Sequence, residues 1–322
     1  MATLKRIPLG KSNLQLSPIG LGCWQFSGKS MSAFWNSPPQ DEINNIVKAA
    51  IDGGINWFDT AEMYGNGASE TALSTALQAA GKKNGDVIIA TKWNPILRRA
   101  SSIAKTFPAR ERHLSPFEID LFQVHLPYSF SSVEAQLNAM ADLLDAKKIK
   151  TVGVSNFNER KMRQAHKVLK ARGYDLASNQ MRYNLLDRRI EKDGVMAAAK
   201  ELNISIIAYS PLAQGLLGGK YHSDPKAIES VPMMRHRAFR GKIEKSRPLV
   251  NALGEIAKGY GVSTSQVALN WLVTFSGETV LAIPGATRVE QAKQNCLAMS
   301  FRLTAAEMTK IDELSKVFMD KR

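Results

Sequence analysis

Short apolar runs alternate with segments of helical pattern along this chain, and that alternation limits the possible folds more than any other feature. The runs lack a clean polar–apolar alternation, as expected of parallel strands covered on both faces. Strands are predicted at residues 19–24, 56–61, 87–93, 119–125, 151–156, 178–184, 205–210 and 280–286. Helices are predicted at 41–54, 69–81, 131–148, 158–173, 190–203, 264–275, 288–295 and 304–317.

Eight strand–helix units predict an α/β protein, a closed (β/α)8 TIM barrel that forms a single domain over residues 1–322. Residues 5–18 resemble a short β-hairpin, placed to plug the N-terminal end of the barrel. Loop insertions are expected at the C-terminal face, the largest at 213–262, after the seventh strand. Pro108 interrupts a helical pattern at 101–116, so a broken or shortened helix is expected there.

Basic residues outnumber acidic ones, 43 to 29, which gives a formal net charge of +14. Such a balance favours polyanions such as nucleic acids, anionic membranes and phosphorylated cofactors. The densest basic segment, 233–247, also contains a glutamate, and no basic run is pure enough for a nucleic-acid arm. We therefore expect a solvated basic surface, or one that attracts a cofactor phosphate, and no nucleic-acid partner.

Cys23 and Cys296 lie far apart, without the spacing of a disulfide framework or a metal site, so no metal is expected. The first residues contain no apolar signal core. No apolar segment approaches the roughly 20 residues that span a bilayer. These features predict a cytoplasmic protein without a membrane partner.

Four chemically active side chains fall where barrel enzymes hold their active sites, at the C-terminal ends of strands. Asp59, Lys92 and His125 end or nearly end three consecutive predicted strands, and Tyr64 follows Asp59 in the adjoining loop. Each has a structural alternative: a strand-end cap, turn packing, a satisfied ion pair or a hydrogen-bonded core histidine. Their joint placement favours one shared site.

The four groups fit an acid catalyst for carbonyl chemistry. Tyrosine has a pKa of about 10, too high for efficient proton transfer near neutrality. A lysine about 4 Å away contributes about 1 kcal/mol in water and about 4 kcal/mol at a semi-buried site. We therefore expect Lys92 to lower the pKa of Tyr64 in a recessed pocket. Asp59 would keep Lys92 protonated, and His125 would hydrogen-bond the substrate oxygen.

With these residues in place, the chain resembles the aldo-keto reductase superfamily, in its bacterial-type NADPH-dependent branch. The resemblance covers essentially the whole chain and rests on 19-IGLGCW-24, 53-GGINWFDTAEMYGNGASE-70, 90-ATKW-93, 120-DLFQVH-125, 152-VGVSNF-157, 208-AYSPLAQGLLGGK-220 and 283-IPGATRVEQAKQN-295. It implies that Asp59, Tyr64, Lys92 and His125 are catalytic. It also implies reduction of aldehydes or ketones to alcohols by hydride transfer from nicotinamide C4, with Tyr64 as proton donor.

The resemblance implies NADP(H), extended across the barrel mouth. By this resemblance, the nicotinamide is held by Ser155, Asn156, Gln180 and Tyr209. The pyrophosphate is held by Ser210, Leu212 and Gly215. The 2′-phosphate and adenine are held by Gly285, Ala286, Thr287, Arg288, Gln291, Gln294 and Asn295. Alternatively, these positions are helix caps, a strand exit and turns. Many family members carry Lys at the position of Gly285 and Arg at that of Gln291, so the preference for NADP over NAD stays open.

Candidate walls of the substrate pocket are Trp24, Trp35, Trp93 and Tyr128, each of which has packing as its alternative role. An aromatic rim suits apolar or aromatic carbonyls.

The segment 233–242 is either a lid over the pyrophosphate or a solvated loop. The resemblance favours a monomer, and it leaves a second function open, an NADP(H)-binding regulatory or sensor subunit with little turnover.

Overall fold

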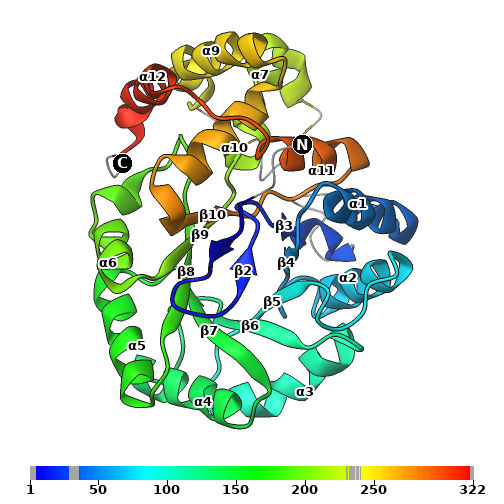
Figure 1. The fold of residues 1–322 in the computed structure, drawn as a ribbon, viewed down its shortest axis with the longest axis vertical. Helices are drawn as coiled ribbons and strands as arrows, with labels where there is room; N and C mark the ends of the chain where they lie inside the picture. Colours follow the sequence, from blue (N-terminus) through cyan, green and yellow to red (C-terminus); the bar gives the residue numbers. More distant parts are fainter. Residues whose placement is uncertain are drawn as a thin grey trace.

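The computed structural model describes residues 5–28, 36–229, 231, 236, 239 and 241–319. Within them, eight parallel strands form one sheet in which each strand pairs with the next along the chain (Figure 1). The strands are β3 (Leu21–Gly22), β4 (Trp57–Asp59), β5 (Ile88–Trp93), β6 (Ile119–Val124), β7 (Ile149–Ser155), β8 (Leu176–Arg182), β9 (Ser205–Tyr209) and β10 (Val280–Ala282). Each overlaps a predicted strand.

The sheet closes on itself where its first and last strands meet. The N–H of Gly20 donates to the carbonyl of Ala282 at 2.8 Å, and the N–H of Gly22 donates to Pro284 at 3.1 Å. A side chain at Gly22 has no room, because a Cβ there would lie 2.8 Å from the carbonyl oxygen of Ile283. The closure confirms the predicted (β/α)8 barrel.

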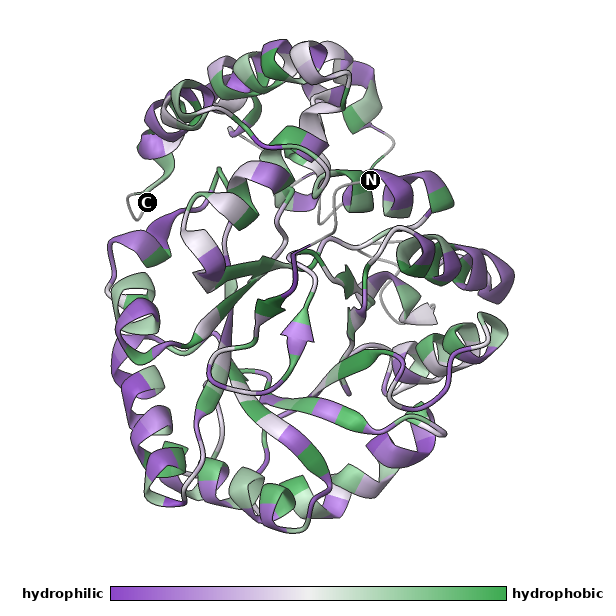
Figure 2. Ribbon diagram, in the orientation of Figure 1, coloured by the Kyte–Doolittle hydropathy of each residue, from purple (hydrophilic) through white to green (hydrophobic). Residues whose placement is uncertain are grey.

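Helices surround the barrel and turn their apolar faces toward it (Figure 2). Those that follow or precede strands are α1 (Gln40–Asp52), α2 (Ala68–Ala79), α3 (Ser102–Leu114), α4 (Val133–Asp145), α5 (Glu159–Ala171), α6 (Val195–Leu202), α10 (Thr264–Thr274) and α11 (Val289–Leu297). Several begin at side-chain caps: Ser132 accepts the Ala135 N–H for α4, and Asn158 accepts that of Lys161 for α5. Such caps satisfy backbone donors that a helix start leaves without a partner.

Helix α3 corrects the expectation at Pro108, because the helix runs unbroken from Ser102 to Leu114. The proline ring leaves the carbonyl of Ala104 without its usual partner. Ala104 and Pro108 are both exposed, so water can hydrate that carbonyl. On the opposite face Ile103 and Phe107 are buried and hold the helix against the barrel.

An N-terminal hairpin of β1 (Ile7–Pro8) and β2 (Gln15–Leu16) lies across one end of the barrel (Figure 1). Leu9 and Leu16 are fully buried in a cluster formed with barrel residues. Gly10 approaches so closely that a Cβ would lie 2.5 Å from the carbonyl oxygen of Ala177, and its N–H donates to Ser205 Oγ at 2.8 Å. The hairpin therefore fills the N-terminal end, as the sequence predicts.

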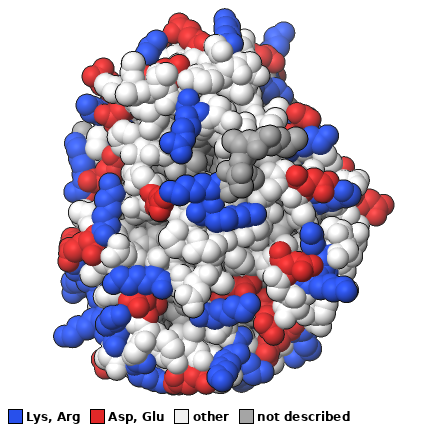
Figure 3. Space-filling view, in the orientation of Figure 1, with Lys and Arg blue, Asp and Glu red and all other residues white. Residues whose placement is uncertain are grey.

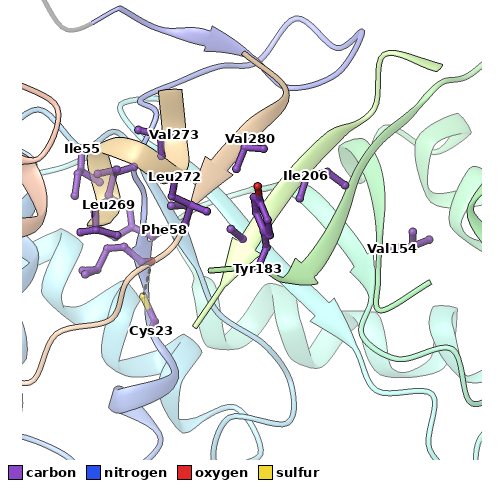
Figure 4. Packing of buried hydrophobic residues seen from close by; sticks show 14 of the residues in the cluster. Cys23, Ile55, Phe58, Val154, Tyr183, Ile206, Leu269, Leu272, Val273 and Val280 are labelled. Carbon is purple, nitrogen blue, oxygen red and sulfur yellow. Dashed lines mark hydrogen bonds between the residues drawn. The ribbon is translucent and has the colours of Figure 1, made fainter. Parts of the chain in front are cut away.

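The main core lies between the sheet and the helices. Figure 4 shows Phe58 of β4 close to Leu269, Leu272 and Val273 of α10, in a layer that also contains Ile55. All five side chains are buried. Burial of this kind is the dominant favourable term in folding.

The predicted insertion after β9 contains α7 (Lys220–Ser223) and α9 (Ile243–Tyr260), and α12 (Ala305–Ser315) follows α11. Helix α9 packs against α10 and α12 at one side of the barrel (Figure 1). Short 3-10 helices are η1 (Trp24–Phe26), η3 (Arg189–Glu191), η4 (Ala213–Gly218), η5 (Pro225–Ile228), η6 (Gly277–Thr279) and η7 (Lys316–Phe318). Most of the segment 233–242 lies outside the described residues.

A buried arginine fixes α12 to the barrel. Arg188 pairs with Glu191 at 2.7 Å and with Asp312 of α12 at 2.7 Å, and its guanidinium lies over the ring of Trp271 at 4.9 Å. On the face shown in Figure 3, acidic side chains lie among the Lys and Arg side chains. The excess of basic residues is thus distributed across that face, as expected of a solvated surface.

Candidate active site

A buried ion pair lies at the C-terminal ends of two neighbouring strands. Asp59 is the last residue of β4, and Lys92 is the next-to-last residue of β5. Lys92 Nζ donates to Asp59 Oδ1 at 2.5 Å and to the carbonyl of Thr60 at 2.8 Å. Both side chains are almost wholly removed from solvent, so each charge depends on the other.

Two glutamine amides hold the second oxygen of Asp59. Gln180 Nε2 donates to Asp59 Oδ2 at 2.8 Å, and Gln123 Nε2 donates at 3.2 Å. The family resemblance implies a cofactor role for Gln180, whereas Gln123 is not among the predicted site residues. A polar residue inside the apolar run of β6 was the signal for it, because a buried amide needs a partner.

Tyr64 and His125 complete the group. Their rings meet edge to face with centroids 5.6 Å apart, and Lys92 Nζ lies 5.0 Å from the centre of the Tyr64 ring. The ring of Trp24 of η1 is also near Tyr64, at 6.4 Å between ring centres. The structure therefore brings together all four residues of the predicted tetrad.

The protonation states differ from expectation at one point. Burial, reinforced by the negative charge of Asp59, raises the pKa of Tyr64 well above 10. The expected lowering of this pKa is wrong in direction, because desolvation of the phenolate dominates. Burial, then the charge of Lys92, lowers the pKa of His125 well below 6.5. At neutral pH the site thus holds a phenol and a neutral imidazole.

The residues assigned to the nicotinamide form a connected chain of hydrogen bonds. Tyr209 Oη donates to Asn156 Oδ1 at 3.0 Å, Asn156 Nδ2 donates to Ser155 Oγ at 2.9 Å, and Ser155 Oγ donates to the carbonyl of Gln180 at 2.9 Å. Asn156 has a φ of 59°, a left-handed conformation that is uncommon outside glycine. The ends of β7, β8 and β9 are thereby connected next to Asp59.

The segment assigned to the pyrophosphate has an unusual backbone. Ser210, Ala213 and Gln214 all have positive φ angles, of 50°, 48° and 60°, and Gly215 follows at 98°. Leu212 lies between them, at the start of η4. Left-handed non-glycine residues carry strain and gather at ligand-binding segments, and successive turned N–H groups suit an anion.

The segment assigned to the 2′-phosphate and adenine holds donors without partners. Arg288 at the start of α11 is exposed and makes no ion pair within the described part of the chain, and the Nδ2 of buried Asn295 has no partner there. Gln291 is engaged differently, because its Oε1 accepts the N–H of Thr287 at 2.8 Å. A free cation and a free amide fit a phosphorylated nucleotide.

The remaining members of this segment contact neighbouring residues of the protein. Gly285 packs against Gln25, whose Oε1 a Cβ would approach to 2.0 Å, so no lysine fits there without rearrangement. Ala286 is buried, and Gln294 Nε2 donates to Glu290 at 3.5 Å.

The residues predicted to form the walls of the substrate pocket lie in different parts of the structure. Trp24 lies beside Tyr64, and Tyr128 is 68% exposed on the loop after β6. Trp93 is a correction: it is fully buried on the helix side of β5, where its indole N–H donates to Ser102 of α3 at 3.0 Å. It faces away from Lys92 because neighbouring strand residues point to opposite faces. Trp35 lies outside the described residues.

The same residues lie in a chain that matches a known protein family. The sequence model of the Aldo/keto reductase family matches residues 18–316. The chain belongs to this family. It is therefore an oxidoreductase that acts on carbonyl groups with a nicotinamide cofactor. Among the helices that the structure describes in this aldo/keto reductase, none combines the length and the hydrophobicity of a membrane span.

Individual relatives are similar over most of their length. An uncharacterised oxidoreductase of Mycobacterium tuberculosis is 36% identical over 307 residues, which covers 94% of this chain and 91% of the relative. The chloroplastic pyridoxal reductase of Arabidopsis thaliana is 31% identical over 317 residues, covering 94% and 84%. The structure of a glycerol dehydrogenase from Gluconobacter oxydans is 28% identical, with a TM-score of 0.84 and coverage of 100% and 98%.

Proposed function

We propose that this aldo/keto reductase reduces aldehydes or ketones to alcohols with NADPH, and that Tyr64 donates the proton to the carbonyl oxygen. The observation that carries the proposal is the grouping of Tyr64, His125 and the buried pair Lys92–Asp59 at the strand ends. We further propose that the chain acts as a single-domain monomer in the cytoplasm.

The raised pKa of Tyr64 keeps its proton in place at neutral pH, as a proton donor requires. His125 stays neutral, so its ring can donate one hydrogen bond to the carbonyl oxygen without carrying a charge. Lys92, held by Asp59, places a positive charge near the Tyr64 ring that stabilises negative charge as it develops on the oxygens.

NADPH, when bound, supplies the hydride from nicotinamide C4. Ser155, Asn156 and Gln180 would hold its carboxamide, with Tyr209 against the ring. The segment 210–215, which contains four residues with positive φ, would hold the pyrophosphate. Arg288 with Asn295 would bind the adenosine end. Arg288 supports NADPH over NADH, since a guanidinium binds a phosphate with charge-assisted hydrogen bonds.

A regulatory subunit with little turnover is not favoured. A protein that only binds the cofactor does not need a tyrosine beside a buried Lys92–Asp59 pair. Burying such a pair costs free energy, and a role in proton transfer explains why the protein keeps it.

The names of the relatives point to an aromatic aldehyde, pyridoxal, and to a polyol, glycerol. Both are reasonable probes, because an enzyme catalyses its reaction in both directions.

The test is the consumption of NADPH, and separately of NADH, by the purified protein with aromatic aldehydes, 2-oxoesters, methylglyoxal and pyridoxal. Tyr64→Phe is the matched variant, because it removes only the acidic hydroxyl. We expect turnover with NADPH, and a loss of kcat of about 10²- to 10⁴-fold in the variant, with NADPH binding retained. Full activity in Tyr64→Phe would exclude Tyr64 as the acid, and tight binding without turnover would favour the regulatory role.

A further inference from the structure

Two buried carboxylates flank Tyr64 along the chain. Glu62 lies two residues before Tyr64, and Glu70 lies six residues after it, in the first turn of α2. Glu62 is 5% exposed and Glu70 is 0% exposed. A buried carboxylate is costly unless it is paired or hydrogen-bonded, so its partners are part of how the loop is held.

One guanidinium reaches both carboxylates. Arg110 of α3 is buried, with its Nε 2.9 Å from Glu70 Oε2 and its Nη1 3.3 Å from Glu62 Oε1. Its N–H groups are not aligned along these contacts, so they are ion pairs rather than well-directed hydrogen bonds. A planar, forked cation can bridge two anions in this way, which a point charge cannot do.

The other partners come from the same strand–helix unit. At one end of the loop, Arg98 Nη1 donates to Glu62 Oε1 at 2.7 Å and the N–H of Asn94 donates to Glu62 Oε2 at 2.9 Å. At the other end, Thr91 Oγ1 donates to Glu70 Oε1 at 2.6 Å. Both ends of the tyrosine loop are therefore tied to β5, its following loop and α3.

The loop between the two carboxylates is tightly bent. Gly65, Asn66 and Gly67 have φ angles of 70°, 53° and 97°. Gly67 lies against His113 of α3, whose Nδ1 a Cβ would approach to 2.1 Å. A backbone in these conformations persists only when its surroundings hold it.

We propose that Arg110 is a positioning residue, which holds Tyr64 at the carbonyl by joining both ends of the segment 62–70 to α3. Arg110 acts through Glu62 and Glu70. The inference rests on the proposed function for the role of Tyr64. The geometry of the loop is independent of that role.

The variant that tests this is Arg110→Lys, which keeps the positive charge and removes the fork. Arg188→Lys is the matched control, because Arg188 is also a buried arginine between two carboxylates, Glu191 and Asp312, in another part of the fold. Each change disturbs one buried ion cluster. Only the first disturbs the loop of Tyr64.

In Arg110→Lys we expect kcat for a carbonyl substrate to fall at least about 10-fold, since misplacing a catalytic group by about 1 Å costs as much as about 100-fold. The Kd for NADPH, measured by fluorescence, should stay unchanged. Arg188→Lys should keep the kcat of the wild type. Equal losses in the two variants, or no loss in Arg110→Lys, would overturn the proposal. If Arg110→Lys does not fold, Glu62→Gln against Glu191→Gln gives the same comparison.

Hydrogen exchange in the free protein provides a second measurement that needs no turnover. The N–H of Tyr64 donates to Ala61 at 3.0 Å, and that of Ser69 donates to Tyr64 at 3.1 Å. Both amides should exchange at least about 10-fold faster in Arg110→Lys than in Arg188→Lys, because local opening sets exchange. Equal rates would overturn the proposal. If the wild-type protein reduced no carbonyl, the proposed function would be refuted. The hydrogen-exchange comparison would still decide whether Arg110 holds the loop of Tyr64.

Discussion

Lys92 and Asp59 face each other inside the barrel, with Nζ 2.5 Å from Oδ1 and both side chains closed off from water. Gln123 and Gln180 add two donors to the other carboxylate oxygen. The pair is therefore the most strongly constrained polar element of the site, and its two members depend on each other for stability as well as for chemistry.

Removing one member should be worse for folding than removing both. Lys92→Met leaves a buried carboxylate without its countercharge, so we expect the free energy of unfolding to fall by about 3–5 kcal/mol. The double variant Lys92→Met/Asp59→Asn should recover most of this loss, although neither protein should turn over. Urea unfolding curves measure the effect. Additive losses in the double variant would contradict the interdependence of the pair.

Glu70 should make stability depend on pH near neutrality. Burial raises its pKa from 4.5 to about 7, against the opposing charge of Arg110. Between these values the folded protein holds a proton that the unfolded chain has released, so stability falls as pH rises from about 4.5 to about 7. The full effect is about 3 kcal/mol at about 1.4 kcal/mol per pKa unit.

Glu70→Gln removes this titration, so its unfolding free energy should change less between pH 5 and pH 8 than that of the wild type. Chemical denaturation at a series of pH values measures both slopes. Glu307→Gln is a suitable control, because the pKa of Glu307 is lowered and its titration lies below this range. Parallel curves for Glu70→Gln and the wild type would show that Glu70 ionises normally.

Two charges at the start of α11 should have opposite effects on cofactor choice. Arg288 is exposed and unpaired within the described chain, whereas Glu42 Oε1 accepts the N–H of Val289 at 3.2 Å. Hydrogen bonds to charged groups contribute about 1.5–3 kcal/mol. Arg288→Ala should therefore weaken NADPH binding by about 10-fold.

Glu42→Gln should strengthen NADPH binding severalfold, because it removes a negative charge from the place proposed for the 2′-phosphate. NADH affinity should stay nearly constant in both variants and serves as the internal control. Titration of cofactor fluorescence gives all four dissociation constants. Equal changes for NADPH and NADH would place the 2′-phosphate elsewhere.

Pro108 should be a weak point of α3. The helix continues through it, at the loss of one hydrogen bond to the exposed carbonyl of Ala104. Pro108→Ala restores the N–H, and proline costs up to about 3 kcal/mol relative to alanine in a helix interior. We expect a higher Tm in calorimetry. An unchanged or lower Tm would mean that the ring itself makes packing contacts of similar value.

The sequence was sufficient for the order of strands and helices, because the apolar runs and turn residues are local signals. It also indicated Asp59, Tyr64, Lys92 and His125, because strand ends converge in a barrel. The outward orientation of Trp93 could have been predicted from the sequence, since a strand that turns Lys92 inward turns the next residue outward. The ion-pair partners of Glu62 and Glu70 could not be predicted, because ion pairs between distant segments leave no periodic pattern.

The protonation state of Tyr64 was also beyond the sequence. The direction of its pKa shift depends on how deeply the phenol is buried and on how near Asp59 lies, and both need the three-dimensional positions of the surrounding atoms. The continuous helix at Pro108 was likewise not predictable from local sequence. The packing of Ile103 and Phe107 against the barrel outweighs the tendency of proline to break a helix.

The hairpin that fills the N-terminal end of the barrel leaves the opposite end as the approach to the site, because Leu9 and Leu16 occupy the interior below it. If the cofactor and the carbonyl both enter from that end, the molecule that binds deeper would have to arrive first and leave last. Its release, rather than the transfer of a proton or a hydride, would then set the rate of turnover.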